Sequence, residues 1–226
     1  MLLILILSFN LSILLAMLSV FVLLYMLIMI PIGIYASRRV KTSNDFVLAG
    51  RNLPFGMALA TVFATWFGSE TILGTSSKVV EGGFSSVLED PFGASLCLIL
   101  VGLFFVRPLY KLNFLTIGDF FEDRFGKYLA ALLSIIIILT YFGWVGAQFV
   151  ALGIILNLVL GLPIFWGTLI SVLIVLTYTY VGGMWSVAIT DTVQMGVIVV
   201  SLLVVLFEVL GSVGGFSKVI SETPPE

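Results

Sequence analysis

The sequence predicts an all-α, polytopic membrane protein. Of its 226 residues, 61% are hydrophobic and only 10% are charged, whereas a soluble domain needs far more polar surface to remain in water. The apolar residues form continuous runs such as LSIIIILT, without the alternation of short half-buried strands. Since about 20 apolar residues in a helix cross roughly 30 Å of hydrocarbon, we expect several membrane crossings.

Six spans are expected within a single transmembrane domain that occupies residues 1–226. The ten uncharged residues before the first span lack the basic region and the cleavage site of a signal peptide, so we expect them to extend the first helix. Proline costs least in the first turn of a helix, and prolines open three of the spans. We interpret Glu89 and Asp90, which precede Pro91, as a helix start. The expected spans are at about 11–35, 53–75, 91–106, 128–156, 163–180 and 191–213.

The basic residues predict the orientation in the membrane. Of ten Lys and Arg residues, four lie between the first and second spans and four between the third and fourth. Because cytoplasmic loops carry the excess of Lys and Arg, we expect the N-terminus outside. These eight residues are Arg38, Arg39, Lys41, Arg51, Arg107, Lys111, Arg124 and Lys127.

Two connections have recognisable patterns. The segment LTIGDFFEDRFGK mixes apolar and charged residues at helical spacing, which predicts a short interfacial helix after the third span. The segment YVGGMWS predicts a Gly-Gly turn between the fifth and sixth spans.

Composition also excludes several classes of function. The net charge of −2 does not suggest a nucleic-acid partner. Cys97 is the only cysteine, so no internal disulfide pair is possible, and without histidine the usual residue of zinc and acid–base chemistry is missing.

The second span carries an unusual polar segment, FATWFGSETILGTSS. Glu70 lies well inside this span, and an ionisable residue at such a depth indicates a functional site. Gly68 and Gly74 flank it and loosen the helix, while neighbouring hydroxyl groups compensate freed backbone groups. A broken helix exposes carbonyl oxygens to a cation such as sodium. The alternative is that these small residues only pack between helices.

Four further residues have two open interpretations. Asp191 opens the sixth span, either as a helix N-cap, for which Thr190 is an alternative, or as an acid on a cation path. Trp66 and Trp144 either fill volume or form an aromatic wall for an organic cation. We expect Gln148, in the fourth span, to bond a neighbouring helix.

Three segments resemble the sodium:solute symporter family. GRNLPFGMALATVFATWFGSETILG resembles its first core helix with the preceding Gly-Arg loop. RPLYKLNFLTIGDFFEDRFGK resembles the loop after its second core helix, and YTYVGGMWSVAITDTVQ resembles the signature before its fifth. The match covers residues from about 38 to 213, with the motifs in the order of the family.

This resemblance implies a leucine-transporter-type fold, in which a leading helix precedes the first of two inverted five-helix repeats. It also implies that sodium binds the backbone carbonyls of Ala64 and Phe67, and that Asp191 lies on the ion pathway. The remaining sodium ligands would come from an eighth core helix that this chain does not contain. The implied solute contacts of the first core helix are Gly68, Ser69, Glu70 and Thr71.

Within the family, WFGSETILGT and GASLCLILVGLFFVRPL resemble the choline-transporter branch, whose cage tryptophans would match Trp66 and Trp144. Glu70 departs from that branch, which leaves open a choline-like solute, another amine or an amino acid. The resemblance therefore implies a sodium-coupled symporter in the cell membrane, surrounded by lipid, without covalent chemistry. Because the second repeat is missing, we expect the chain alone to be inactive unless that repeat is supplied in cis or in trans.

Two other functions are also compatible with the sequence. One is a structural or regulatory membrane subunit without a ligand, in which Ala64, Phe67 and Glu70 lie on one unbroken helix. The other is a membrane-embedded enzyme that uses Glu70 and Asp191 as a pair of acids, which requires the two carboxylates to be close together.

Overall fold

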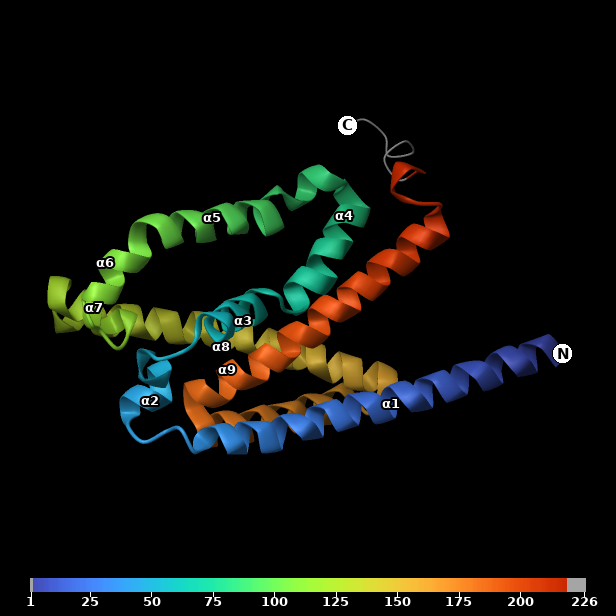
Figure 1. The fold of residues 1–226 in the computed structure, drawn as a ribbon, viewed down its shortest axis with the longest axis horizontal. Coiled ribbons are helices and arrows are strands. Elements are labelled where there is room, and N and C mark those ends of the chain that lie inside the picture. The colour runs from blue at the N-terminus through green and yellow to red at the C-terminus, as the bar shows by residue number, and fades with distance from the viewer. Residues whose placement is uncertain (1, 219–226) are drawn as a thin grey trace.

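The computed structural model describes residues 2–218, and the described chain consists of helices joined by short connections (Figure 1). Residues 1 and 219–226 of the expected domain lie outside it. The first half contains α1 (Leu2–Ser37), α2 (Ser43–Leu48), η1 (Ala49–Arg51), α3 (Phe55–Trp66), η2 (Glu70–Thr75), α4 (Ser76–Gly82), η3 (Phe84–Val87) and η4 (Leu88–Gly93). The second half contains α5 (Ala94–Leu100), η5 (Val101–Phe105), α6 (Val106–Lys111), α7 (Ile117–Phe125), α8 (Lys127–Leu160) and α9 (Ile164–Val213). No strand occurs in the described part, so the predicted all-α class is confirmed.

Four of the described helical segments are long and apolar enough to cross a membrane, or five if the bent pair α2–η1 and α3 forms one span. The first helix begins at Leu2, which confirms that the leading apolar residues extend it. The expected span 91–106 is part of a longer candidate, Ser85–Lys111. The two members of the bent pair meet at 106°, at the connection that Pro54 ends.

The last two expected spans, 163–180 and 191–213, form one element that turns sharply at Gly183. There φ is 50° and ψ is −144°, a conformation that only glycine adopts without strain. Figure 1 shows the first half of α9 running beside α1 and the second half leaving it after the turn. The predicted Gly-Gly turn is therefore present, but the second helix begins beside it and not at Asp191.

This corrects the interpretation of Asp191 and Thr190 as helix caps. Both residues lie inside the second half of α9, because residues 184–190 are already helical. The Thr190 hydroxyl donates to the carbonyls of Ser186 (3.0 Å) and Val187 (2.9 Å) within the same helix, as hydroxyl side chains do in a helix interior.

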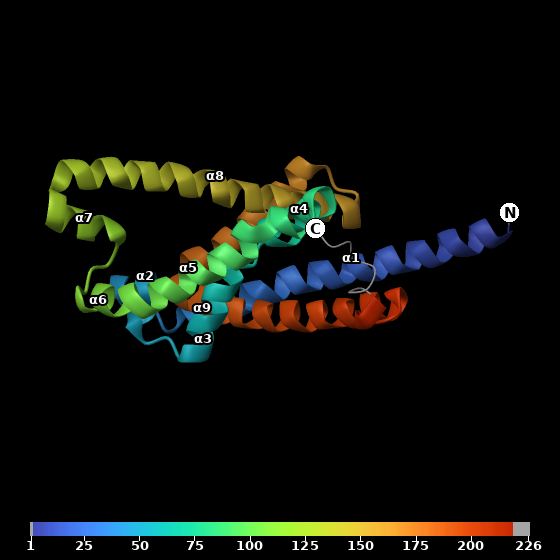
Figure 2. The same ribbon diagram turned by 90° about the horizontal axis from the view of Figure 1, so that it is seen from above.

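Small residues hold the long helices together. Gly33 of α1 lies against Tyr178 and Ser186 of α9, where a Cβ on the glycine would come within 2.3 Å of Tyr178 Cβ. A Cβ on Gly153 of α8 would likewise lie 2.2 Å from the hydroxyl of Thr168 on α9. Such close approach through small residues is typical of membrane helix packing. In the view of Figure 2, α8 and the second half of α9 lie on opposite sides of α1.

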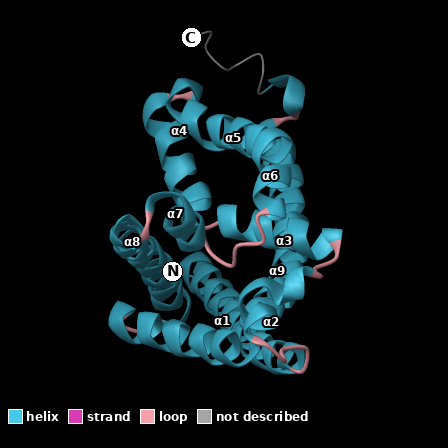
Figure 3. Ribbon diagram, turned by 90° about the vertical axis from the view of Figure 1, so that its left-hand side faces the viewer, coloured by secondary structure: helices cyan, strands magenta, loops and turns pink. Residues whose placement is uncertain are grey.

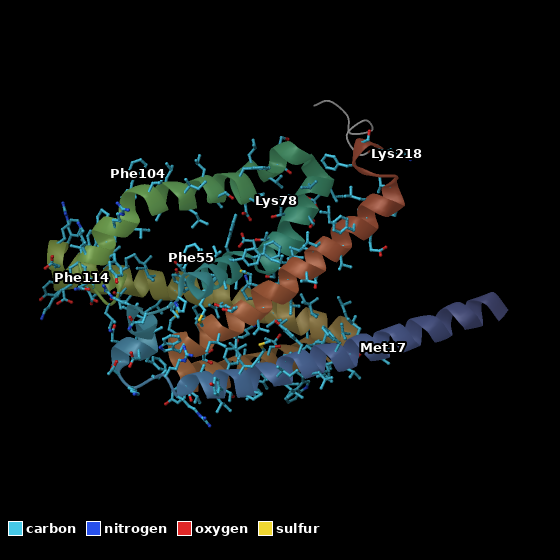
Figure 4. All side chains as sticks on the ribbon, in the orientation of Figure 1. Met17, Phe55, Lys78, Phe104, Phe114 and Lys218 are labelled. Atoms are coloured by element: carbon cyan, nitrogen blue, oxygen red, sulfur yellow. The ribbon has the colours of Figure 1, made fainter. Side chains whose placement is uncertain are left out.

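The segment around α5 and α6 has no cover within the described chain. Every residue from 96 to 113 is exposed, and most of them are apolar. Viewed from one end, α4, α5 and α6 form an arch on the side opposite α1, α2 and α8 (Figure 3). Phe104, which is 65% exposed, points outward from this arch (Figure 4). The apolar surface of α5 and α6 is thus free to meet lipid or another protein segment.

The loops that carry most of the basic residues are joined at one point. The guanidinium of Arg51 donates to the carbonyls of Tyr110 (3.3 Å) and Phe114 (2.8 Å) and to Asn113 Oδ1 (2.5 Å). The predicted interfacial helix follows as α7, and Thr116 and its N3 residue Asp119 form a capping box at its start. The connections after the first and third expected spans therefore lie side by side, as the charge pattern requires; the outside position of the N-terminus remains a prediction.

A broken helix as the candidate functional site

The helix α3 breaks in the middle of the polar segment. It begins at Phe55, directly after Pro54, and continues to Trp66. At Phe67 the backbone leaves the helical region (φ −83°, ψ 75°), and helical structure resumes as the π-helical turn η2, which leads into α4. This break occurs in the expected place.

Two amide groups change their partners at the break. The Gly68 N–H donates to the Trp66 carbonyl at 3.0 Å, and the Ser69 N–H donates to Gln148 Oε1 at 3.1 Å. In a continuous α-helix these amides would donate to the carbonyls of Ala64 and Thr65, four residues earlier. Both carbonyls have therefore lost their regular helical donors, which is the arrangement that makes main-chain oxygens available to a cation.

The expected sodium ligands both lie at this break. Ala64 is in the last turn of α3, and Phe67 is the first residue beyond it. Sodium binds hard oxygen atoms, and main-chain carbonyls next to a helix break supply them. Whether these two carbonyls hold sodium remains a prediction.

Trp66 is tied to a residue that the sequence did not single out as functional. Its indole Nε1–H donates to Asp90 Oδ1 at 3.1 Å, over a separation of 24 residues. Asp90 lies in η4 with an extended backbone (φ −138°, ψ 117°), so it interrupts the helical path there. Asp90 is the extended residue just before the helical residues that resume at Pro91, as expected at a helix start, and its bond with Trp66 is an additional contact. An acid just before a proline was the only signal in the sequence.

Gln148 of α8 binds Ser69, on the far side of the break from Trp66. Its Oε1 accepts from the Ser69 hydroxyl at 2.8 Å as well as from the Ser69 amide. The prediction that Gln148 bonds a neighbouring helix is thus confirmed. Thr71 also contacts the break, because its hydroxyl donates to the Trp66 carbonyl at 3.1 Å.

Trp144 lines a cavity of about 390 Å³ between α3 and α8. The other lining residues are Thr65, Thr140 and Tyr141, and the rings of Trp144 and Tyr141 meet edge to face at 6.1 Å. Trp66 is not among the lining residues. The structure thus brings Trp144 to the helix that carries Trp66, while a cage of both indoles remains a prediction.

Asp191 lies apart from Glu70. Thr61 of α3 lies close enough to act on the Asp191 carboxylate, although Thr61 Oγ1 is buried without a hydrogen bond of ordinary geometry. Tyr25 of α1 and Tyr178 of α9 also lie within range of its charge. Glu70 is exposed, beyond the break. Glu70 is not among the groups that act on the Asp191 carboxylate in the described part of the chain.

A second cavity, of about 400 Å³, lies between α1, α8 and α9. Tyr25 of α1, Gln148 of α8 and Tyr178 and Gln194 of α9 supply its polar groups. Gln148 therefore reaches the α3 break on one side and this cavity on the other.

The family model of the sodium:solute symporter family matches residues 46–224. The chain belongs to this family. The match includes the broken helix, the Asp90 segment, α8 and the Gly183 turn, and it confirms the resemblance that the three sequence motifs indicated. The protein is accordingly a multi-pass protein of the cell membrane.

Individual relatives include two kinds of transporter. The human high affinity choline transporter 1 is 34% identical over 189 residues, which cover 80% of this chain and 33% of that protein. The Drosophila melanogaster high-affinity choline transporter 1 is 32% identical over 185 residues, or 80% and 30% of the two chains. The Vibrio parahaemolyticus sodium/glucose cotransporter is 27% identical over 197 residues, or 85% and 36%. The chain thus spans about a third of the length of the curated relatives it matches.

Proposed function

We propose that this chain forms the first half of a sodium-coupled secondary symporter for a small organic solute. The observation that carries this proposal is the break of α3 at Phe67 and Gly68, which removes the regular amide donors from the carbonyls of Ala64 and Thr65. Ala64 is one of the two proposed sodium ligands, and Phe67, the other, is the residue at which the helix breaks. Membership of the sodium:solute symporter family gives this break its interpretation.

In this proposal sodium binds the carbonyls of Ala64 and Phe67, and Asp191 lies on the path by which the ion leaves or enters. Asp191 is suited to this role because it faces Thr61, one turn before Ala64 on α3. An ion that binds one conformation better than another shifts the protein toward that conformation. Because coupling between two sites is reciprocal, sodium that favours the solute-binding conformation also raises the affinity for the solute.

The solute of this proposal is a small organic cation, choline-like or another amine, although an amino acid is also compatible with the contacts. The names of the choline transporters among the relatives support a cation, and so does the chemistry beside the break. Trp66 and Trp144 offer aromatic faces that attract ammonium groups, while Glu70 and Asp90 supply negative charge. Gly68, Ser69 and Thr71 are the remaining contacts in this proposal.

We further propose that a second repeat, supplied in cis or in trans, completes the site. The uncovered surface of α5 and α6 and the one-third coverage of the relatives support this proposal. The missing sodium ligands come from that repeat, so the 226-residue chain by itself is expected to be inactive.

The two alternatives receive less support. A purely structural subunit requires an unbroken helix through Ala64, Phe67 and Glu70, and α3 ends at Trp66. An enzyme that uses Glu70 and Asp191 requires two adjacent carboxylates, whereas Asp191 interacts with Thr61 of α3, before the break, and Glu70 begins η2 beyond it.

Uptake by liposomes that contain the purified full-length protein tests this function. We expect labelled choline or a related amine to accumulate under an inward sodium gradient and not under an equal potassium gradient. Proline, glucose and a monocarboxylate, each labelled in turn, distinguish the solute classes. Equal uptake of every solute in both gradients would overturn the proposal, while uptake by the isolated 226-residue chain would overturn only the need for a second repeat.

A further inference from the structure

One side chain holds the break of α3 from outside that helix. Gln148 is half-buried in α8, 79 residues from Ser69, and its Oε1 accepts two hydrogen bonds from this one residue. The bond from the Ser69 hydroxyl is 2.8 Å long and the bond from the Ser69 amide is 3.1 Å long.

The amide bond matters most, because it decides where the Ser69 N–H points. Ser69 begins the helical stretch that follows the break. The first amides of a helix lack partners within that helix, and a side-chain oxygen that accepts from them stabilises the helix start. Without Gln148 Oε1, the nearest regular acceptor for this amide is the Thr65 carbonyl, and that bond would close the break.

Gly68 makes the approach of Gln148 possible. A Cβ at this position would lie 3.0 Å from Gln148 Oε1, 3.1 Å from Nε2 and 3.3 Å from Cδ. Few real Cβ contacts are so short, so any larger residue at this position would displace the Gln148 amide group. The glycine and the glutamine therefore fit each other at the break.

We propose that Gln148 is a positioning residue for sodium: its side-chain oxygen keeps α3 broken and so keeps the carbonyls beside the break available to the ion. This inference rests on the proposed function for the role of sodium, but the claim about the break stands on geometry alone. Gln148 does not coordinate the ion in this account. It acts through Ser69.

Three substitutions distinguish the effect of the acceptor oxygen of Gln148 from the effect of its side-chain volume. Gln148→Leu keeps much of the volume but removes the oxygen, and Gln148→Glu keeps two acceptor oxygens. Ser69→Ala removes only the hydroxyl bond and leaves the amide bond in place. The matched control is Gly146→Ala on the same helix, where an added Cβ meets no atom within 4 Å.

The functional readout is the sodium concentration for half-maximal uptake, measured beside the solute KM at saturating sodium in the full-length protein. We expect Gln148→Leu to raise the sodium half-saturation about tenfold, which corresponds to 1.4 kcal/mol. We expect the solute KM at saturating sodium to rise by a smaller factor, because Ser69 is also a proposed solute contact. Ser69→Ala is expected to raise the sodium half-saturation about threefold. The sodium half-saturation of Gln148→Glu is expected to stay within threefold of the wild-type value. An effect of Gln148→Leu no larger than that of Gly146→Ala, or an equal loss of sodium and solute affinity, would overturn the inference.

A distance measurement tests the break without sodium. Phe55, on α3, and Lys78, on α4, lie on the two sides of the break (Figure 4) and are exposed. Spin labels at Phe55→Cys and Lys78→Cys, in a background where the only cysteine is removed by Cys97→Ser, report the separation of the two halves.

We expect Gln148→Leu to shift or broaden this distance distribution by several ångströms and Gly146→Ala to leave it unchanged. An unchanged distribution in Gln148→Leu would overturn the inference even if the wild type binds sodium. If the wild type shows no sodium dependence, the proposed function fails, and the distance measurement alone decides whether Gln148 holds the break.

Discussion

The indole Nε1–H of Trp66 donates to Asp90 Oδ1 at 3.1 Å and so joins the end of α3 to η4. Trp66 is the last residue of α3 before the break, and its own carbonyl accepts from Gly68 and Thr71. The orientation of this indole thus depends on two segments that are 24 residues apart.

Asp90→Ala is expected to weaken solute binding and to leave sodium binding largely intact. The substitution removes an acceptor whose hydrogen bond contributes about 1.5–3 kcal/mol when one partner is charged, so we expect the solute KM to rise about tenfold or more. Initial uptake rates over a range of solute concentrations measure the solute KM. Glu89→Ala, at the exposed preceding residue, is the control, and equal effects of the two substitutions would show that Asp90 does not position Trp66.

Trp144→Ala is expected to reduce the affinity for an organic cation more than the affinity for sodium. A cation over an indole face gains about 0.5–2 kcal/mol, which corresponds to a rise in KM of roughly 2- to 30-fold. Trp166→Ala, at an exposed tryptophan of α9, serves as the control in the same uptake assay. A solute KM that Trp144→Ala leaves unchanged would argue against the aromatic wall.

Gly183→Ala is expected to destabilise the fold. An added Cβ would lie 2.5 Å from the Phe46 carbonyl oxygen, and the positive φ strains any L-residue by about 1–3 kcal/mol. Gly196→Ala in the same helix meets no atom within 4 Å and is expected to be neutral. Thermal unfolding in detergent, followed by the loss of the monodisperse peak, compares the two variants. Equal melting temperatures would mean that the turn of α9 does not depend on glycine.

Arg51→Lys is expected to loosen the contact between the two basic loops. Lysine supplies one ammonium group where the planar guanidinium reaches three oxygens, on Tyr110, Asn113 and Phe114. Limited proteolysis is expected to cut the loop 112–116 at least several times faster in Arg51→Lys than in Arg107→Lys, whose side chain is exposed on α6. Equal cleavage rates would contradict the role of Arg51.

The sequence predicted features that depend on local chemistry. Gly68 and its hydroxyl neighbours indicated the break in α3, and the Gly-Gly pair indicated the turn in α9, because glycine is permissive in its own backbone. The side chains that bind the residues at the break could not be predicted from local sequence. Ser69 meets Gln148 only because α8 packs against the break, and no local pattern specifies a contact across 79 residues.

The start of the last helix was predicted in the wrong place. An acid at the start of an apolar run resembles an N-cap, so the sequence suggested a helix start at Asp191. The glycine at position 183 had already turned the chain, and the following residues continue as a helix. Propensity at one residue was overridden by the position of the turn.

Direct sodium binding by variants of the backbone tests the central claim most sharply. Replacing the amide of Thr65 by an ester weakens the Ala64 carbonyl as an acceptor, and an ester at Gly68 weakens the Phe67 carbonyl. An ester at Met57, near the start of α3, is the control. We predict that both esters beside the break lower the affinity for labelled sodium several-fold while the control ester does not. Wild-type affinity in both of those esters would contradict a sodium site at the break of α3.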